Sequence, residues 1–235
     1  MTFRGIAVLS LLSTQAAVAD QVTVAVASNF LLTAEKIATA FEAETGHDVV
    51  LSNGSTGLLF AQISNGAPFD VFLSADEERP ARLEADGRAL ATRTYAIGGL
   101  ALLSTDPVTV ETAAEDFVGK TAALADPTVA PYGRAATSAM ERLGLDTAAF
   151  RPVMVANVGQ VASVFATGNA QIAFVAVAQL DRVTAPHVLR LDGIAPEIRQ
   201  GAALLSDDPA ARAFFDWLAR PETEALIAAD GYQVP

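Results

Sequence analysis

Short apolar stretches alternate along this chain with segments of helical spacing, and Gly, Ser, Asn or Pro stands at most of the junctions. Residues 22–27 predict a strand that ends at Ser28-Asn29, and apolar residues at roughly helical spacing follow. Residues 49–51 and 71–74 predict two further buried strands, and each precedes a predicted helix. Strands that alternate with helices favour a parallel α/β sheet.

The second half of the chain repeats this order of elements after a polar stretch at residues 106–116. Helical spacing is expected from Ala135 to Leu143 and again from Val161, and two apolar helices separated by Pro221 close the chain. Further strands are expected at residues 100–104, 122–125, 153–156 and 172–177. The sequence therefore predicts two α/β halves.

The first residues indicate export. Arg4 precedes an apolar run at residues 6–12, and the A-x-A pattern at residues 17–19 predicts a signal peptide that is cleaved after Ala19. The run is shorter than the ~20 residues of a membrane-spanning helix. We expect a soluble mature chain.

Composition and charge exclude several classes of function. The chain has no cysteine, so thiol chemistry and thiolate metal sites are excluded and a packed core must provide the stability. A formal net charge of −12 repels nucleic acid and anionic lipid. It also repels anionic ligands, so any anion site must overcome this charge locally. The acidic residues 76–78 are interpreted as the first turn of a helix, where the helix dipole favours negative charge.

Four strand-to-helix turns are small, polar or Gly-containing: Ser28-Asn29 and residues 54–57, 131–133 and 157–159. In an open α/β sheet, ligands bind at the carboxyl ends of strands, where helix N-termini present unpaired N–H groups. An anion site built in this way needs no lysine, and these turns contain no Lys or Arg. Alternatively, the Ser, Thr and Asn side chains only cap their helices. The residues alone leave both interpretations open.

Enzymatic interpretations have less support. Residues 54–57 match neither a phosphate loop nor a nucleophile elbow. His47 and His187 lie in predicted turns without a nearby second ligand, which disfavours a metal site or a catalytic triad. An exported serine hydrolase that uses Ser28 or Ser55 as its nucleophile stays an alternative, although neither has an adjacent base in the sequence.

The segments at residues 26–30, 54–57, 65–76, 130–133, 158–160 and 174–179, in this order, resemble the periplasmic molybdate-binding proteins, which deliver their oxyanion to an ABC importer. The resemblance extends over the mature chain. It implies the two-lobed α/β fold of type II periplasmic binding proteins, with crossing strands between the lobes and one molybdate or tungstate in the cleft. The expected division is a signal peptide at residues 1–19, a first lobe of residues 20–98 and 200–235, and a second lobe of residues 99–199.

The resemblance also assigns contacts with the anion. Carried over position by position, these fall on Ser28, Asn29, Thr56, Tyr132 and Val158, with Ser55 as a weaker candidate. Tyr132 and Val158 would donate chiefly backbone N–H groups, and Asn29 its N–H or its side-chain amide. One branch of the family has a ligand tyrosine where this chain has Ala176. The resemblance further implies a monomeric binding protein of the periplasm that needs no enzymatic residue, cofactor or protein-bound metal cation and that meets a membrane permease.

A site built only from donors prefers a fully deprotonated dianion, because the proton of hydrogen phosphate needs an acceptor. Sulfate is a dianion too, but a rigid cradle sized for molybdate would leave stretched hydrogen bonds around it. We expect discrimination by size, with little separation of molybdate from tungstate. A binder of another oxyanion, such as sulfate, is the nearest alternative.

Overall fold

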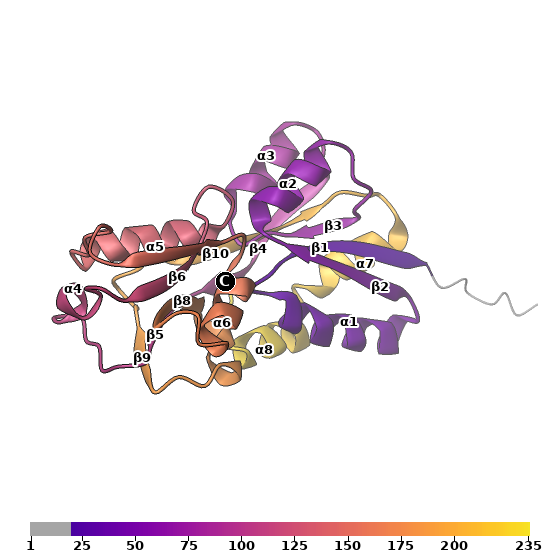
Figure 1. Ribbon diagram of the computed structural model, residues 1–235. Helices are drawn as coiled ribbons and strands as arrows, with labels where there is room; N and C mark the ends of the chain where they lie inside the picture. Colours follow the sequence, from indigo (N-terminus) through magenta and orange to yellow (C-terminus); the bar gives the residue numbers. More distant parts are fainter. Residues whose placement is uncertain (1–19) are drawn as a thin grey trace, which may run out of the picture.

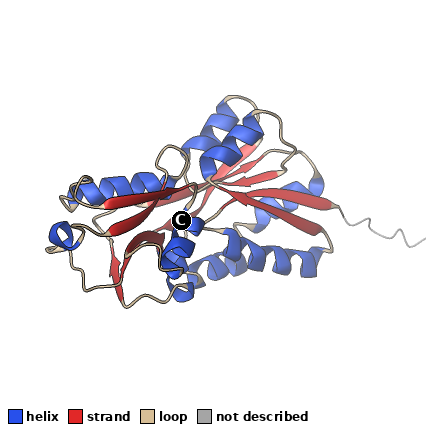
Figure 2. Ribbon diagram, in the orientation of Figure 1, coloured by secondary structure: helices blue, strands red, loops and turns tan. Residues whose placement is uncertain are grey.

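The computed structural model describes residues 20–235, which form two five-stranded sheets (Figures 1 and 2). The first sheet has the order β2-β1-β3-β10-β4, with β1 (Gln21–Ala27), β2 (Asp48–Gly54), β3 (Val71–Leu73), β4 (Ala91–Gly98) and β10 (Ile198–Leu204). The second has the order β7-β6-β8-β5-β9, with β5 (Leu100–Ser104), β6 (Thr121–Ala125), β7 (Arg151–Val155), β8 (Ile172–Ala176) and β9 (His187–Arg190). The predicted signal peptide, residues 1–19, lies outside the described residues.

We call each sheet with its helices a lobe. The first lobe carries α1 (Leu31–Thr45), α2 (Thr56–Ser64), α3 (Glu78–Ala85), α7 (Pro209–Trp217) and α8 (Pro221–Ala229). The second carries α4 (Ala113–Asp116), α5 (Pro131–Arg142), α6 (Val158–Ala166) and the 3-10 helix η1 (Val177–Arg182). In residues 20–235, no helix combines the length and the hydropathy that a bilayer crossing needs.

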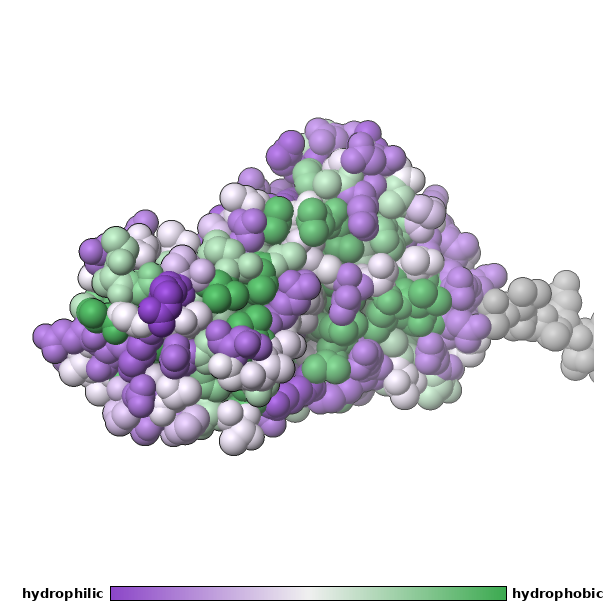
Figure 3. Space-filling model, in the orientation of Figure 1, coloured by the Kyte–Doolittle hydropathy of each residue, from purple (hydrophilic) through white to green (hydrophobic). Residues whose placement is uncertain are grey.

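Strand β1 shows how the first lobe builds two apolar layers. Side chains alternate between the faces of a strand. Val24 therefore belongs to one buried cluster with Phe41 of α1 and Phe214 of α7, whereas its neighbour Ala25 belongs to another with Leu59 of α2. The first sheet thus lies between helices on both faces, as Figure 2 shows. Hydrophobic and hydrophilic residues are interspersed over the surface seen in Figure 3.

The sheets are mixed, so the prediction of a parallel sheet is only partly right. Strand β1 runs parallel to β2 and β3, and β6 runs parallel to β7 and β8. Strand β10 is antiparallel to β3 and β4, and β5 is antiparallel to β8 and β9. The chain passes from β4 to β5 through Gly99 alone, without the helix that a parallel crossover requires. Strands β4, β9 and β10 were not expected from the residue pattern.

Three helices begin earlier than their apolar spacing predicts. Helix α5 begins at Pro131 instead of Ala135, because proline is well suited to the first helical position. Helix α2 begins at Thr56 and helix α6 at Val158. The polar turns of the sequence therefore form the first turns of these helices, and their N–H groups point toward the end of the sheet from which the helices start.

Candidate functional site

The four turns meet at one small pocket between the lobes. The first lobe lines it with Ala27, Ser28, Asn29, Gly54, Ser55, Thr56 and Ala75, and the second with Ala130, Pro131, Tyr132, Asn157 and Val158. All six candidate residues from the sequence are therefore brought together. The cavity has a volume of about 10 Å³. Ser28 and Asn157 also line a more open groove, which has a volume of about 490 Å³.

Backbone N–H groups in this pocket have no protein acceptor. Thr56, Tyr132 and Val158 lie in first helical turns, where an N–H group has no intrahelical partner. Within residues 20–235, neither these three groups nor the N–H of Asn29 donates to another backbone or side-chain atom. Four donors and the positive ends of three helix dipoles thus converge from both lobes.

The capping interpretation holds for one turn and is wrong for another. The side chain of Asn157 accepts a hydrogen bond from the N–H of Gln160 at 3.0 Å, as an N-cap does. Ser55 precedes α2 but makes no such bond. Its hydroxyl is buried and has no hydrogen-bond partner among the described residues. Because an unpaired buried hydroxyl is costly, Ser55 is a stronger candidate donor than the sequence indicates.

The hydroxyls of Thr56 and Ser28 already accept one hydrogen bond each. Thr56 Oγ1 accepts from the N–H of Ala75 at 3.1 Å, and Ser28 Oγ accepts from the N–H of Gly159 of the second lobe at 3.4 Å. A hydroxyl that accepts in this way keeps its own proton to donate. Each can therefore add an O–H donor to the N–H groups around the pocket.

The side-chain amide of Asn29 is engaged behind the pocket. Its Nδ2 donates to Oε1 of Gln200 at 2.8 Å and to the hydroxyl of Tyr232 at 3.2 Å. The Tyr232 hydroxyl donates in turn to the carbonyl oxygen of Asn29 at 2.7 Å, and Tyr95 also donates to Gln200 Oε1 at 3.1 Å. Of the two groups expected from Asn29, the backbone N–H is therefore the one without a partner.

Gln200, Tyr95 and Tyr232 form the hydrogen-bond network behind the pocket, and sequence reasoning missed them. Gln200 and Tyr232 lie 171 and 203 positions from Asn29, and no local pattern marks them. Burial raises the pKa of Tyr95 well above its ordinary value, and it raises the pKa of Tyr232 as well. Both phenols therefore stay protonated at neutral pH and keep the Asn29 turn in place through hydrogen bonds.

No charged side chain lines the pocket among the described residues. His47 and His187 are not part of it, and residues 20–235 hold no group of three or more His, Cys, Asp or Glu placed to bind a metal ion. Ala176 is buried in β8 and does not line the pocket either. The pocket is thus a site of neutral donors, suited to an anion without a transferable proton.

Gly57 allows the two lobes to approach each other beside the pocket. Its N–H donates to the carbonyl oxygen of Val129 in the second lobe at 2.8 Å. A Cβ atom at this position would lie 2.9 Å from the same oxygen, which is closer than side chains tolerate. The glycine of the second turn is therefore needed for backbone contact between the lobes.

Comparison with known proteins places the chain in a family. Residues 22–233 match the family described as bacterial extracellular solute-binding proteins. The chain belongs to this family. Two curated relatives of this solute-binding protein are named molybdate-binding protein ModA. That of Azotobacter vinelandii is 41% identical over 231 residues, which cover 92% of the chain and 91% of the relative. That of Rhodobacter capsulatus is 38% identical over 227 residues, which cover 92% and 89%.

A solved structure supports the same assignment. The periplasmic molybdate-binding protein of Azotobacter vinelandii aligns with a TM-score of 0.83 and 38% identity over 91% of this chain and 99% of that one. The predicted two-lobed periplasmic binding protein fold is therefore confirmed. Because these relatives and the family are named as binding proteins, the chain is a solute-binding protein and not an enzyme.

Proposed function

We propose that this solute-binding protein holds molybdate or tungstate in the pocket between its lobes and delivers it to an ABC importer. The observation that carries the proposal is the convergence of four polar turns, two from each lobe, on one pocket without a charged side chain. The relatives with more than a third of their residues identical are named for molybdate binding, which supports this ligand over other anions.

The proposed contacts use the donors that have no protein acceptor. Asn29, Thr56, Tyr132 and Val158 donate backbone N–H groups to the anion. Ser28, Ser55 and Thr56 donate their hydroxyl protons. Each hydrogen bond to a charged ligand contributes roughly 1.5–3 kcal/mol before the cost of removing water. Several such bonds in a closed pocket give a submicromolar dissociation constant.

Neutral donors also explain how an acidic protein takes up a dianion. The formal net charge is −12, but salt at physiological ionic strength screens the repulsion between exposed charges beyond about 8 Å. The helix N-termini of α2, α5 and α6 act at contact distance, and salt screens them much less in a closed pocket. The local field of the pocket therefore outweighs the net charge.

The proposal includes the remaining expectations from the sequence. The chain is exported through a signal peptide at residues 1–19, acts in the periplasm as a monomer and meets a membrane permease. Residues 20–98 and 200–235 form the first lobe, and residues 99–199 form the second. The strong negative charge disfavours nucleic acid as a partner.

Two rivals are less well supported. A sulfate binder would use the same kind of donors, but the sulfate ion is smaller than molybdate. A serine hydrolase would need a base beside Ser28 or Ser55, and among the described residues no histidine or carboxylate lines the pocket.

Titration calorimetry of the purified protein with molybdate, tungstate, sulfate and phosphate tests the proposal. We expect submicromolar and similar dissociation constants for molybdate and tungstate, and binding at least about 100-fold weaker for the other two, a difference of about 2.7 kcal/mol. Comparable binding of sulfate and molybdate, or no heat with molybdate, would contradict the proposal. Native mass spectrometry of protein from medium with trace molybdate gives an independent readout of a bound oxyanion.

A further inference from the structure

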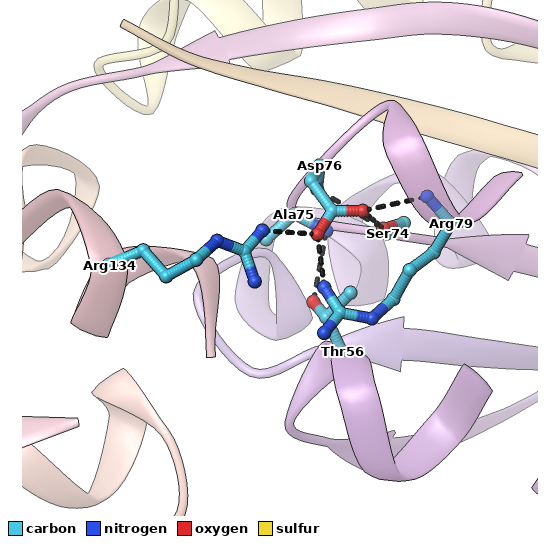
Figure 4. A network of polar contacts seen from close by, with 6 residues as sticks. All are labelled: Thr56, Ser74, Ala75, Asp76, Arg79 and Arg134. Carbon is cyan, nitrogen blue, oxygen red and sulfur yellow. Dashed lines mark hydrogen bonds and ion pairs between the residues drawn. The ribbon is translucent and has the colours of Figure 1, made fainter. Parts of the chain in front are cut away.

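The carboxylate of Asp76 joins groups from both lobes (Figure 4). Its Oδ1 accepts hydrogen bonds from the backbone N–H of Arg79 and from the hydroxyl of Ser74, both at 3.1 Å. Its Oδ2 accepts from the guanidinium of Arg79 and, at 2.8 Å, from Nη2 of Arg134. Helix α3 begins at Glu78, so Asp76 lies before the first helical turn and not in it as the sequence predicts, and its carboxylate makes an ion pair between the lobes.

The partners of Asp76 belong to different lobes. Ser74 and Arg79 lie in the same segment of the first lobe, between the end of β3 and the first turn of α3, so lobe movement leaves these bonds intact. Arg134 lies on α5 of the second lobe. Periplasmic binding proteins open and close around ligands by hinge movement of their lobes. The contact between Asp76 and Arg134 is therefore the one that requires closed lobes.

Both ends of this ion pair are close in sequence to the anion pocket. Ala75, which precedes Asp76, lines the pocket and donates its N–H to Thr56 Oγ1 at 3.1 Å. Arg134 follows Tyr132 by two residues on the same helix. The movement that brings the N–H of Tyr132 to the anion thus also brings the guanidinium of Arg134 to Asp76.

We propose that Arg134 is a positioning residue that slows anion release by pairing with Asp76 when the lobes close. The inference rests on the proposed function and adds a residue outside the pocket lining. The side chain of Asp76 is 12% exposed and that of Arg134 is 40% exposed. Such a partly exposed pair stabilises the closed form modestly, by a factor of about three to five. Because Arg79 continues to neutralise Asp76, losing Arg134 leaves no unpaired carboxylate.

The test compares Arg134→Gln with two further variants. Arg134→Lys keeps the charge and restores part of the pairing. Arg199→Gln is the matched control, because Arg199 lines the same surface groove as Arg134 but pairs with Glu77 inside the first lobe. It removes the same unit of charge without breaking a contact between the lobes.

The measurement is the release rate of radioactive molybdate after dilution into excess unlabelled molybdate, with the association rate and the ligand-free melting temperature recorded for each variant. For Arg134→Gln we expect release about three- to fivefold faster, with the association rate and melting temperature nearly unchanged. The release rate of Arg134→Lys should lie between those of Arg134→Gln and the unmodified protein. Arg199→Gln should release molybdate at the rate of the unmodified protein.

The outcomes separate the inference from the proposed function. Unchanged release in Arg134→Gln, or equal acceleration in Arg134→Gln and Arg199→Gln, overturns the inference while molybdate binding stands. If Arg134→Gln lowers the melting temperature strongly, the release rates of Arg134→Lys and Arg199→Gln are compared instead. Equal release rates of these two variants overturn the inference. No molybdate binding to the unmodified protein overturns the proposed function and the inference together.

Discussion

The hydroxyl of Tyr132, which projects from α5 of the second lobe, ends against Gly98, the last residue of β4 in the first lobe. The same residue is buried and lines the pocket between the lobes. A Cβ atom at Gly98 would overlap the hydroxyl oxygen and would lie 2.8 Å from Nε2 of Gln200. Tyr132 thus connects the pocket with the place where the chain passes from one sheet to the other.

Gly98→Ala should therefore weaken molybdate binding. The added methyl group pushes Tyr132 and α5 away from the first lobe, and overpacking of this kind costs roughly 1–3 kcal/mol, or about five- to 150-fold in affinity. Calorimetry measures the effect. The double variant Gly98→Ala/Tyr132→Phe lacks the overlapping oxygen and should bind more tightly than Gly98→Ala alone. Equal affinities for the two would show that the clash is not with Tyr132.

Ser55→Ala should change stability and affinity in opposite directions. The Ser55 hydroxyl is buried without a partner in the described structure, so removing it relieves a desolvation cost and leaves the ligand-free protein as stable as before or more stable, by up to about 1 kcal/mol. The same change removes a donor to the anion and should weaken binding about tenfold or more. Thermal melts with and without molybdate measure both effects. A drop in ligand-free stability together with unchanged affinity would place the hydroxyl outside the site.

Thr56→Val should weaken binding and also lower the stability of the fold. Valine keeps the shape but removes the hydroxyl that accepts from the N–H of Ala75, so this buried N–H loses its partner at a cost of about 1–3 kcal/mol. Thr56→Ser keeps the hydroxyl and is the control. We expect calorimetry to show at least about tenfold weaker molybdate binding for valine and nearly unchanged binding for serine. Full affinity in Thr56→Val would remove this hydroxyl from the proposed contacts.

The meeting of the four turns could be predicted because strand ends and helix starts are local features. Parallel strands such as β1 and β6 place their carboxyl ends at one edge of each sheet, and the turns follow them in sequence. The partners of those turns could not be predicted. Gln200 reaches Asn29 from an antiparallel strand that no helix precedes, and Arg134 reaches Asp76 across the lobes. Such contacts depend on how the lobes pack, which residue spacing does not encode.

The same limit applies to Ser55 and Asn157, which look alike in the sequence as polar residues before a helix. The side chain of Asn157 caps α6, whereas the hydroxyl of Ser55 has no partner in the described residues. Both interpretations of the polar turns were open from the residues. Capping is right for Asn157 and wrong for Ser55, whose role as a donor to an anion stays a prediction. Only the tertiary structure distinguishes a cap from an unpaired donor.

The pair of Glu77 and Arg199 predicts a dependence of stability on pH. Hydrogen bonds from Arg199 and Thr94 hold the pKa of Glu77 below its ordinary value of 4.5. A carboxyl group whose pKa is lowered by folding stabilises the protein above its unfolded pKa, and this contribution is lost as the pH falls through the folded value. Glu77→Gln should therefore lower the free energy of unfolding at pH 7 but have almost no effect at pH 2.

Because the side chain of Glu77 is 40% exposed, solvent screening limits the difference at pH 7 to about 0.5 kcal/mol. Urea unfolding of both proteins at each pH measures it, and 0.5 M salt should reduce it further. Glu78→Gln is the control for the helix dipole, since Glu78 lies in the first turn of α3 and makes no ion pair within residues 20–235. A Glu77→Gln difference that persists at pH 2 would mean that the side chain stabilises the fold through packing and not through its charge.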